Sequence, residues 1–311
     1  MQAQAVVFKS PKQLELRGLE LRAPALGEIE VAIEFSGIST GTERLLWDGT
    51  MPAFPGMGYP LVPGYESVGR IVKAGAGTTL AVGSRVFVPG AHSFEGVRNL
   101  FGGSASRLVV SEDRTVAVED HLGEKAVLLA LAATSQHTLA NQTPPDLIIG
   151  HGVMGRLLAR LTLAAGHPAP MVWEINPSRQ LGALGYTVVS PEQDERRDYR
   201  AIYDVSGDSD ILDKAIARQA PGGEVVLAGF YRQSLSFAFA PAFMRETRIR
   251  IAAQWQRADL LAVSELAHRG KLSLDGLITH SEKSANASSA YDVAFGDATC
   301  LKMILDWKHS A

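Results

Sequence analysis

The sequence has only one cysteine, Cys300, among its 311 residues. A single cysteine cannot form an internal disulfide bond, and it excludes a zinc site built from several cysteines. Long apolar runs are also lacking: the longest, residues 126–133, is far too short to span a bilayer. No basic segment followed by an apolar stretch stands near the N-terminus, so no signal peptide is expected. These absences predict a cytoplasmic protein without a transmembrane segment.

An excess of charge of one sign is lacking as well. Lys and Arg total 30 against 33 Asp and Glu, which gives a formal net charge of −3. A protein that binds nucleic acid by neutralising phosphates needs a basic excess, so we expect no nucleic-acid partner. Hydrophobic residues make up 46% and charged residues 20% of the chain, a globular composition. The length suits two domains that each bury a core.

The N-terminal part of the chain, residues 1–118, has the pattern of a β-rich domain. Short apolar runs alternate with Gly, Pro and Ser, as strands and turns do. Their irregular spacing favours a small, partly open barrel over a repeat array. The expected strands are Ala5–Phe8, Ile29–Ile33, Val68–Val72, Val86–Val88 and Leu108–Val110.

Residues 119–274 have the pattern of an α/β domain. A helix is expected over Leu128–Leu139, and six strand-like runs then alternate with helical segments. This alternation predicts a doubly wound parallel sheet of the Rossmann type. The last segment, residues 275–311, is expected to rejoin the first domain. The six expected strands are Asp146–Ile149, Met171–Glu174, Tyr186–Val189, Ala201–Val205, Gly223–Leu227 and Ile249–Ala252.

A glycine pattern, Gly150-x-Gly152-x-x-Gly155, follows the first of these strands. With 30 glycines in the chain, such a match arises by chance ~0.3 times, so its context matters. Here the match stands between a strand and a helix, as dinucleotide binding requires. The helix start at Val153 and Met154 offers N–H groups and a positive dipole to a pyrophosphate.

The helix after the glycine pattern is amphipathic. Its apolar residues, including Leu157, Leu158 and Leu161, share one face, and Arg156 and Arg160 fall on the opposite, polar face. Gly166 is expected to end the helix.

An acidic residue, Glu174, ends the second expected strand, 24 residues on from Gly150. This spacing is close to the ~20 residues at which a carboxylate binds the ribose hydroxyls of NAD. A carboxylate repels a 2′-phosphate, so NAD is favoured over NADP, although Arg179 leaves NADP open. The carboxyl ends of the fourth and fifth strands should also face the cofactor. They carry Ser206, Gly207, Gly229 and Phe230.

The order of these domains resembles the medium-chain dehydrogenase/reductase superfamily, which contains the zinc alcohol dehydrogenases. Residues 36–43 resemble the segment that supplies the first zinc cysteine, and residues 62–66 resemble its Gly-His-Glu motif, with Tyr65 in place of the ligand. Residues 133–137 resemble the segment after the third ligand, whose position falls near Ala130. The resemblance implies a GroES-like substrate domain, a cofactor contact at Thr134, and a homodimer joined at the edges of the Rossmann sheets.

The resemblance does not extend to the zinc ligands. All three ligand positions hold residues that bind zinc poorly, and residues 91–103 replace the four-cysteine lobe. The eight histidines include no pair at i, i+4 metal spacing. We therefore predict an enzyme without a metal.

Three segments resemble a narrower family within the superfamily, the bacteriochlorophyllide dehydrogenases. They are Gly37–Glu43, Met51–Glu66 and Cys300–Lys308. This resemblance implies a tetrapyrrole substrate, whose 3-(1-hydroxyethyl) group is oxidised to 3-acetyl with NAD as hydride acceptor.

Without zinc, proton removal from the alcohol needs other groups. We predict a hydroxyl relay with a base behind it, formed by Thr42, Tyr65 and Glu66 with Ser39 and Thr40 as neighbours. Each residue also has a structural interpretation. The two threonines suit the cap of a helix that begins near residue 43. Tyr65 suits a half-buried core position with its hydroxyl on a backbone group, and Glu66 suits an internal salt bridge.

The stretch Trp47–Leu61 is apolar, and its prolines and glycines prevent a regular element. We predict that it forms one wall of the macrocycle site, and the alternative is a loop that packs on its own domain. The expected contacts are Trp47, Met51, Phe54, Met57 and Tyr59.

Two other functions remain open at this point. A zinc-free quinone or enone reductase would reduce C=C and prefer NADPH, against which Glu174 argues. A non-catalytic protein would bind the dinucleotide or pigment without transferring hydride.

Overall fold

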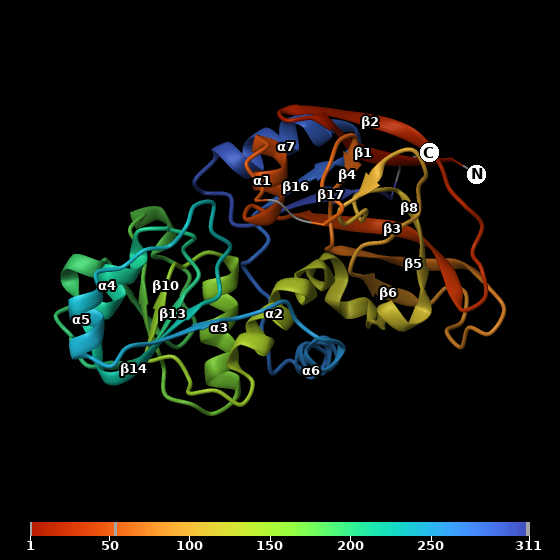
Figure 1. The fold of residues 1–311 in the computed structure, drawn as a ribbon. Coiled ribbons are helices and arrows are strands. Elements are labelled where there is room, and N and C mark those ends of the chain that lie inside the picture. Colours follow the sequence, from red (N-terminus) through yellow and green to blue (C-terminus); the bar gives the residue numbers. More distant parts are fainter. Residues whose placement is uncertain (1, 53–54, 309–311) are drawn as a thin grey trace. The chain divides into compact units, whose positions relative to one another are not determined.

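The computed structural model describes residues 2–52 and 55–308 and divides the chain into two compact units (Figure 1). Unit 1 contains the residues up to 130 together with those from 274 onward, and unit 2 contains residues 131–273. The sequence placed this boundary at residue 118. The structure moves it because the 3-10 segment η2, Asp120–Leu128, packs against strands β3, β5 and β6 of unit 1.

Unit 1 is built from two sheets. The smaller has the order β2-β1-β4-β7, and the larger has the order β16-β17-β3-β5-β6-β9, with β8 also paired to β3. The strands are β1 Gln2–Ser10, β2 Gln13–Glu20, β3 Glu28–Ile38, β4 Leu61–Val62, β5 Ser67–Ala74, β6 Arg85–Val88, β7 Arg98–Asn99, β8 Arg107–Ser111, β9 Val116–Ala117, β16 His280–Lys283 and β17 Met303–Asp306. Two helices, α1 Thr42–Asp48 and α7 Ala287–Gly296, and the 3-10 turns η1 Glu112–Arg114 and η5 Ser284–Asn286 complete it.

The five strands expected in the N-terminal part all form. Because β-strands alternate faces, many of their apolar residues enter one core, in which Phe8, Val31 and Ile71 are almost fully buried. The chain returns to this core at its end, where β17 pairs antiparallel with β3 and places Leu305 opposite Ser36. The C-terminal return therefore completes the larger sheet.

Unit 2 contains one parallel sheet of six strands in the order β12-β11-β10-β13-β14-β15. Numbered along the chain this is the order 3-2-1-4-5-6, so the six predicted strands form the doubly wound arrangement. The order reverses between β10 and β13, where such sheets bind ligands. The strands are β10 Leu147–Ile149, β11 Met171–Trp173, β12 Thr187–Val189, β13 Tyr199–Asp204, β14 Gln219–Leu227 and β15 Arg248–Ile251.

The helices of unit 2 do not cover every crossover. α3 joins β10 to β11, α4 joins β13 to β14 and α5 joins β14 to β15, but the segment between β11 and β12 contains only the 3-10 turn η3, Pro177–Arg179. The helices are α2 Leu129–Leu139, α3 Val153–Ala164, α4 Ile211–Arg218, α5 Phe239–Met244 and α6 Arg257–His268, and a second 3-10 turn, η4, spans Pro191–Gln193.

Helix α3 begins at Val153, inside the glycine pattern, and Gly166, with φ +80°, follows its end as predicted. The prediction for its polar face was wrong. Arg156 and Arg160 are only 4% and 6% exposed, because their guanidinium groups donate to backbone carbonyls inside the unit. Burial of Arg156 is tolerated because its Nε and both terminal nitrogens donate to backbone carbonyls.

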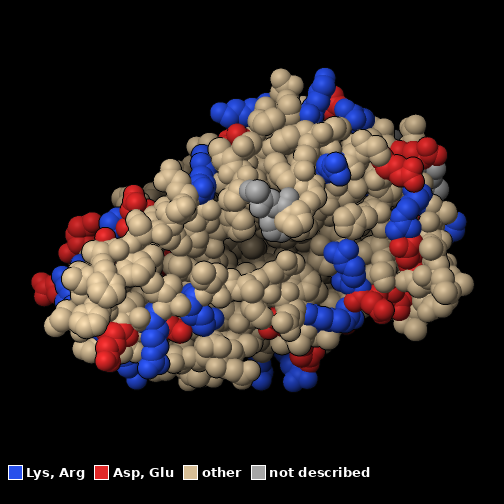
Figure 2. Space-filling model, in the orientation of Figure 1, with Lys and Arg blue, Asp and Glu red and all other residues tan. Residues whose placement is uncertain are grey.

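The surface agrees with the balanced composition. On the face drawn in Figure 2, basic and acidic side chains lie interspersed among uncharged ones. Within the part of the chain that the structure describes, no helix is both long and apolar enough to cross a membrane.

Candidate functional site

The glycine turn of unit 2 has the geometry of a dinucleotide cradle. Gly150 has φ +104°, and a Cβ at Gly155 would lie 1.9 Å from the carbonyl oxygen of Gly150, so both positions need glycine. A Cβ at Gly152 would meet no atom within 4 Å, and no side chain caps the helix at this residue. The start of α3 at Val153 and Met154 is thus open to an anion, which helix N-terminal N–H groups bind.

Glu174 follows β11 directly, and the structure places it at this turn. Its carboxylate accepts hydrogen bonds from the backbone N–H groups of His151 (3.1 Å) and Asn176 (2.8 Å), and the side chain is 8% exposed. Two backbone donors orient the carboxylate, while each oxygen keeps a lone pair for a further donor. This arrangement fits a ribose diol.

The ends of β13 and β14 lie beside the same turn. A Cβ at Gly150 would lie 3.2 Å from Cα of Ser206, and one at Gly229 would lie 3.3 Å from the N atom of Gly207. Phe230 is 44% exposed, and its carbonyl oxygen would lie 3.4 Å from a Cβ at Gly207. The structure therefore brings these predicted cofactor residues together. Thr134 lies apart from this set in the sequence, half-buried on α2.

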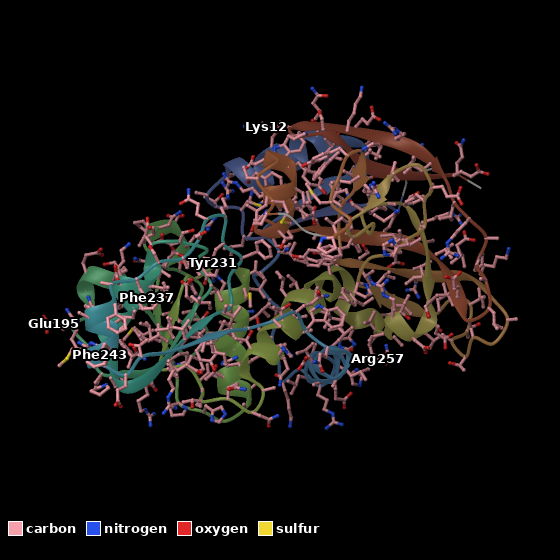
Figure 3. The ribbon with its side chains drawn as sticks, in the orientation of Figure 1. Lys12, Glu195, Tyr231, Phe237, Phe243 and Arg257 are labelled. Carbon is pink, nitrogen blue, oxygen red and sulfur yellow. The ribbon has the colours of Figure 1, made fainter. Side chains whose placement is uncertain are left out.

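A buried acid, Asp204, holds these two strand ends in place. Its carboxylate accepts hydrogen bonds from the Ser206 hydroxyl (2.7 Å) and the Tyr231 hydroxyl (2.5 Å), and its carbonyl accepts from the N–H groups of Ala228 and Gly229. Burial raises the pKa of the carboxyl, and the Tyr231 and Ser206 hydrogen bonds oppose this shift. Figure 3 labels Tyr231 among the side chains of unit 2.

In unit 1 the structure brings together three of the hydroxyls that are predicted to form a relay. The hydroxyls of Ser39 and Tyr65 lie 2.7 Å apart, and Thr42 also hydrogen-bonds Tyr65. Burial and the nearby Glu66 raise the pKa of Tyr65, so its phenol stays protonated and can only pass a proton on. Its ring packs edge-on against Phe101, with ring centroids 5.5 Å apart.

The sequence also allowed two structural explanations for these residues: a helix cap for the two threonines and a core position for Tyr65. Helix α1 begins at Thr42 with Gly41 as its N-cap and no side-chain cap, so the capping interpretation of Thr40 and Thr42 was wrong. Tyr65 is half-buried, as the core interpretation expected, but its hydroxyl contacts the side chain of Ser39 and not a backbone group.

Glu66 forms the internal salt bridge that the sequence left open. Lys302 Nζ lies 2.7 and 3.0 Å from the two carboxylate oxygens and also donates to the carbonyl of Ile38 (3.1 Å). Both side chains are almost fully buried. Gly37 makes room for the pair, because a Cβ there would lie 2.3 Å from Oε2 of Glu66.

A second buried carboxylate, Glu43, was missed by the sequence analysis. It accepts hydrogen bonds from the backbone N–H of Ser39 (3.1 Å) and from the Tyr291 hydroxyl (2.8 Å). Burial raises the pKa of Glu43 to about 7, with a smaller rise from Glu66. Its signal was a charged residue two positions before the buried pair Leu45 and Leu46, but its partner Tyr291 is too distant in sequence to be inferred.

The chemistry of the donor set bears on metal binding. Residues 36–43, which resemble the segment of the first zinc ligand, contain no cysteine or histidine, and the other two positions hold Tyr65 and Ala130, which offer no nitrogen, thiolate or carboxylate donor. Across residues 2–52 and 55–308, no three or more His, Cys, Asp and Glu side chains group in a way that could hold a metal ion. The residues present do not fit a catalytic zinc.

The described residues of the apolar stretch 47–61, which begins in the last turn of α1, pack on the core of their own unit. Trp47, Met51, Met57 and Tyr59 are half-buried against this core, and the Tyr59 hydroxyl donates to the carbonyl of Leu46. Trp47 contacts the Phe8 ring edge-on, with centroids 5.4 Å apart. The fifth predicted substrate contact, Phe54, lies outside the described residues. Contact with a substrate stays a prediction for all five.

A doubly wound sheet with this glycine turn, together with a β-rich unit completed by the C-terminus, defines a medium-chain dehydrogenase/reductase. Residues 25–120 match the alcohol dehydrogenase GroES-like domain. Solved structures agree: an Escherichia coli alcohol dehydrogenase with NADH superposes with a TM-score of 0.84 at 20% identity, covering 98% of this chain and 99% of that one. A Geotrichum candidum acetophenone reductase with NAD gives 0.81 at 19%, covering 98% and 97%. At these identities the likeness concerns the fold.

Two curated relatives are much more similar in sequence. Both are named 2-desacetyl-2-hydroxyethyl bacteriochlorophyllide A dehydrogenase. The protein from Rhodobacter capsulatus is 55% identical over 99% of each chain, and that from Cereibacter sphaeroides is 51% identical over 100% of each. The chain belongs to this family of dehydrogenases, and it is an oxidoreductase.

Proposed function

We propose that this chain oxidises the 3-(1-hydroxyethyl) group of a bacteriochlorophyllide to 3-acetyl, with NAD as acceptor and without a catalytic zinc, in bacteriochlorophyll synthesis. The observation that carries the proposal is the sequence identity of 55% to a relative of that name over almost the whole chain. The hydroxyl cluster of unit 1 and the glycine turn of unit 2 supply groups for the two halves of the reaction.

The choice of NAD rests on Glu174. Its carboxylate is oriented by two backbone N–H groups, and a fixed negative charge at this position accepts a ribose diol and repels a 2′-phosphate. The open N-terminus of α3 would hold the pyrophosphate. When bound, NAD accepts the hydride that leaves the carbinol carbon.

The remaining chemistry concerns the alcohol proton. Ser39, Thr42 and Tyr65 form hydrogen-bonded hydroxyls that can receive this proton from the substrate and pass it on. The substrate lowers the demand on the protein, because its carbinol carbon is attached to a conjugated macrocycle that spreads developing positive charge. The reaction then needs less of the electrostatic stabilisation that zinc supplies to a developing alkoxide.

Of the two buried carboxylates, we assign the role of base to Glu43. Glu66 is held by Lys302 on both oxygens, so it would have to leave an ion pair to accept a proton. Glu43 has no such pair among its hydrogen bonds, and its pKa of about 7 lies near neutral pH, where a general base works best. Glu66 and Lys302 then keep the segment carrying Tyr65 in place.

The proposal is tested by incubating the protein with NAD and a 3-hydroxyethyl bacteriochlorin and following the long-wavelength absorption band. We expect conversion to the acetyl product, no turnover with NADP, and an unchanged rate after exhaustive chelation. Turnover that needs a stoichiometric metal would overturn the metal-free mechanism. Binding of the dinucleotide and pigment without any hydride transfer would overturn the assignment as an enzyme.

We also propose a homodimer formed along β15. This strand is the last of its sheet and pairs with β14 on one side, which leaves its other edge available to a second copy. Ile251 on β15 is 76% exposed, and Phe243 and Met244 of the preceding helix α5 are 66% and 77% exposed. Figure 3 labels Phe243 on this helix. Exposed apolar side chains at a strand edge favour a protein partner.

A further inference from the structure

The crossover between β11 and β12, residues 174–186, lacks the helix that usually joins parallel strands. A helix satisfies its own carbonyl groups internally, whereas an irregular segment needs other donors. This segment directly follows the β11 strand and begins with Glu174. The groups that fix this segment therefore also fix Glu174, the residue that we assign to the ribose of the dinucleotide.

The donor is the buried Arg156 of helix α3. Its guanidinium donates to the carbonyls of Gly182 (3.1 Å), Arg179 (2.9 Å) and Leu181 (2.8 Å), and its Nε donates to the carbonyl of His151 (3.0 Å). One side chain thus joins the glycine turn to three carbonyls of the crossover. Gly182 has φ +83°, and a Cβ there would lie 2.6 Å from the guanidinium, so the segment is shaped around it.

His151 makes the second link between the turn and the crossover. Its Nδ1–H donates to the carbonyl of Arg179 (2.6 Å), and its Nε2 accepts from the Tyr186 hydroxyl (2.8 Å). The carbonyl can only accept, which places the ring proton on Nδ1. Burial lowers the pKa of His151 to about 4, so the ring is neutral at physiological pH. Its backbone N–H donates to Glu174.

We propose that Arg156, supported by His151, is a positioning residue for the adenosine half of the dinucleotide. The two residues do for this crossover what a helix does elsewhere: they fix residues 174–182 against the glycine turn, so that the Glu174 carboxylate meets the ribose in a single orientation. The inference rests on the proposed dinucleotide function. It assigns no part in hydride transfer to either residue.

The test compares two ligands that share the adenosine half, NADH and ADP-ribose. In Arg156→Met we expect the Kd of both, measured by titration calorimetry, to rise about tenfold by the same factor, since the loss lies in the half they share. The kcat at saturating NAD should stay unchanged. Arg156→Lys keeps the charge and part of the hydrogen bonding, so it should recover part of the affinity. If Arg156→Met does not fold, Arg156→Lys replaces it in this test.

Arg218→Met is the matched control. Arg218 also holds a loop of unit 2 by backbone carbonyls, those of Pro191 (3.1 Å) and Asp194, but its loop follows β12 and not β11. This variant should bind both ligands like the wild type. Wild-type affinity in Arg156→Met and Arg156→Lys would overturn the inference, and so would a rise in the Kd of NADH without a rise for ADP-ribose. A wild-type protein that binds neither ligand would instead refute the proposed cofactor.

Discussion

Two buried carboxylates of unit 1 show how neighbours decide the behaviour of one residue type. Glu66 has an ammonium group within 3.0 Å of both oxygens, whereas Glu43 has a phenol and a backbone N–H. A neutral environment without a cation in direct contact disfavours the charged form, and the pKa of Glu43 rises accordingly. The sequence analysis selected Glu66 and passed over Glu43, because nothing local distinguishes a paired carboxylate from an unpaired one.

Replacing Glu43 by Gln should remove the base and keep the shape of the site. We expect kcat to fall by about 10²–10⁴-fold, the usual contribution of general base catalysis. In the wild type kcat should rise as the pH passes about 7, because the carboxyl must lose its proton to act, and this limb should vanish in the variant. The pH profile of kcat checks this.

Glu15→Gln is the control for that change. Glu15 lies on β2 of the same unit and is partly exposed. Glu15→Gln should keep both the kcat of the wild type and its pH profile. Full activity of Glu43→Gln with an unshifted profile would contradict the assignment of the base.

At the scale of the element, prediction from sequence succeeded where a signal is local. The six strands of unit 2 are short apolar runs between turn residues, and each forms within a few residues of its expected bounds. The glycine turn likewise needs only neighbouring residues. The helix-free crossover and the burial of Arg156 could not be predicted, because their hydrogen bonds join α3 to residues more than 20 positions away.

The exposed edge strand gives a prediction at this scale. Ile251→Asp places a charge on β15, and in a dimer joined there this charge would be buried without a partner. We expect the variant to be monomeric at concentrations where the wild type is dimeric, as measured by light scattering after size exclusion. Leu26→Asp, at a 79% exposed position of unit 1, should leave the dimer intact. An Ile251→Asp protein of wild-type mass would exclude this edge as the interface.

At the scale of the whole chain, one buried group in each unit, Glu43 and His151, should contribute to the acid response in opposite directions. The pKa of Glu43 in unit 1 is raised to about 7, so between its ordinary pKa of 4.5 and 7 the folded unit holds a proton that the unfolded chain has lost. Glu43 therefore adds stability to unit 1 as the pH falls through this range. The pKa of His151 in unit 2 is lowered from 6.5 to about 4, so the contribution of this residue to the stability of unit 2 is lost as the pH falls.

Each effect amounts to at most about 3 kcal/mol, and they oppose each other over nearly the same pH window. Denaturation followed at pH 7 and pH 5, with Trp173 as a buried reporter in unit 2, should show the contribution of His151 as a greater loss of stability on acidification in the wild type than in His151→Gln. His151→Gln should remove that loss, and Glu43→Gln should remove the gain of unit 1. An unaltered pH response in both variants would contradict these shifts.

The C-terminal return has a consequence for how the protein is made. Tyr291 and Lys302, which hold the two buried carboxylates, lie on the last segment of the chain, and β17 completes a sheet begun by residues 28–38. On the ribosome, unit 2 emerges in full before unit 1 can close. The cluster that we propose as a relay is therefore completed only after unit 2 has been synthesised, so a nascent chain cut short near residue 300 carries a complete glycine turn and lacks the lysine that pairs with Glu66.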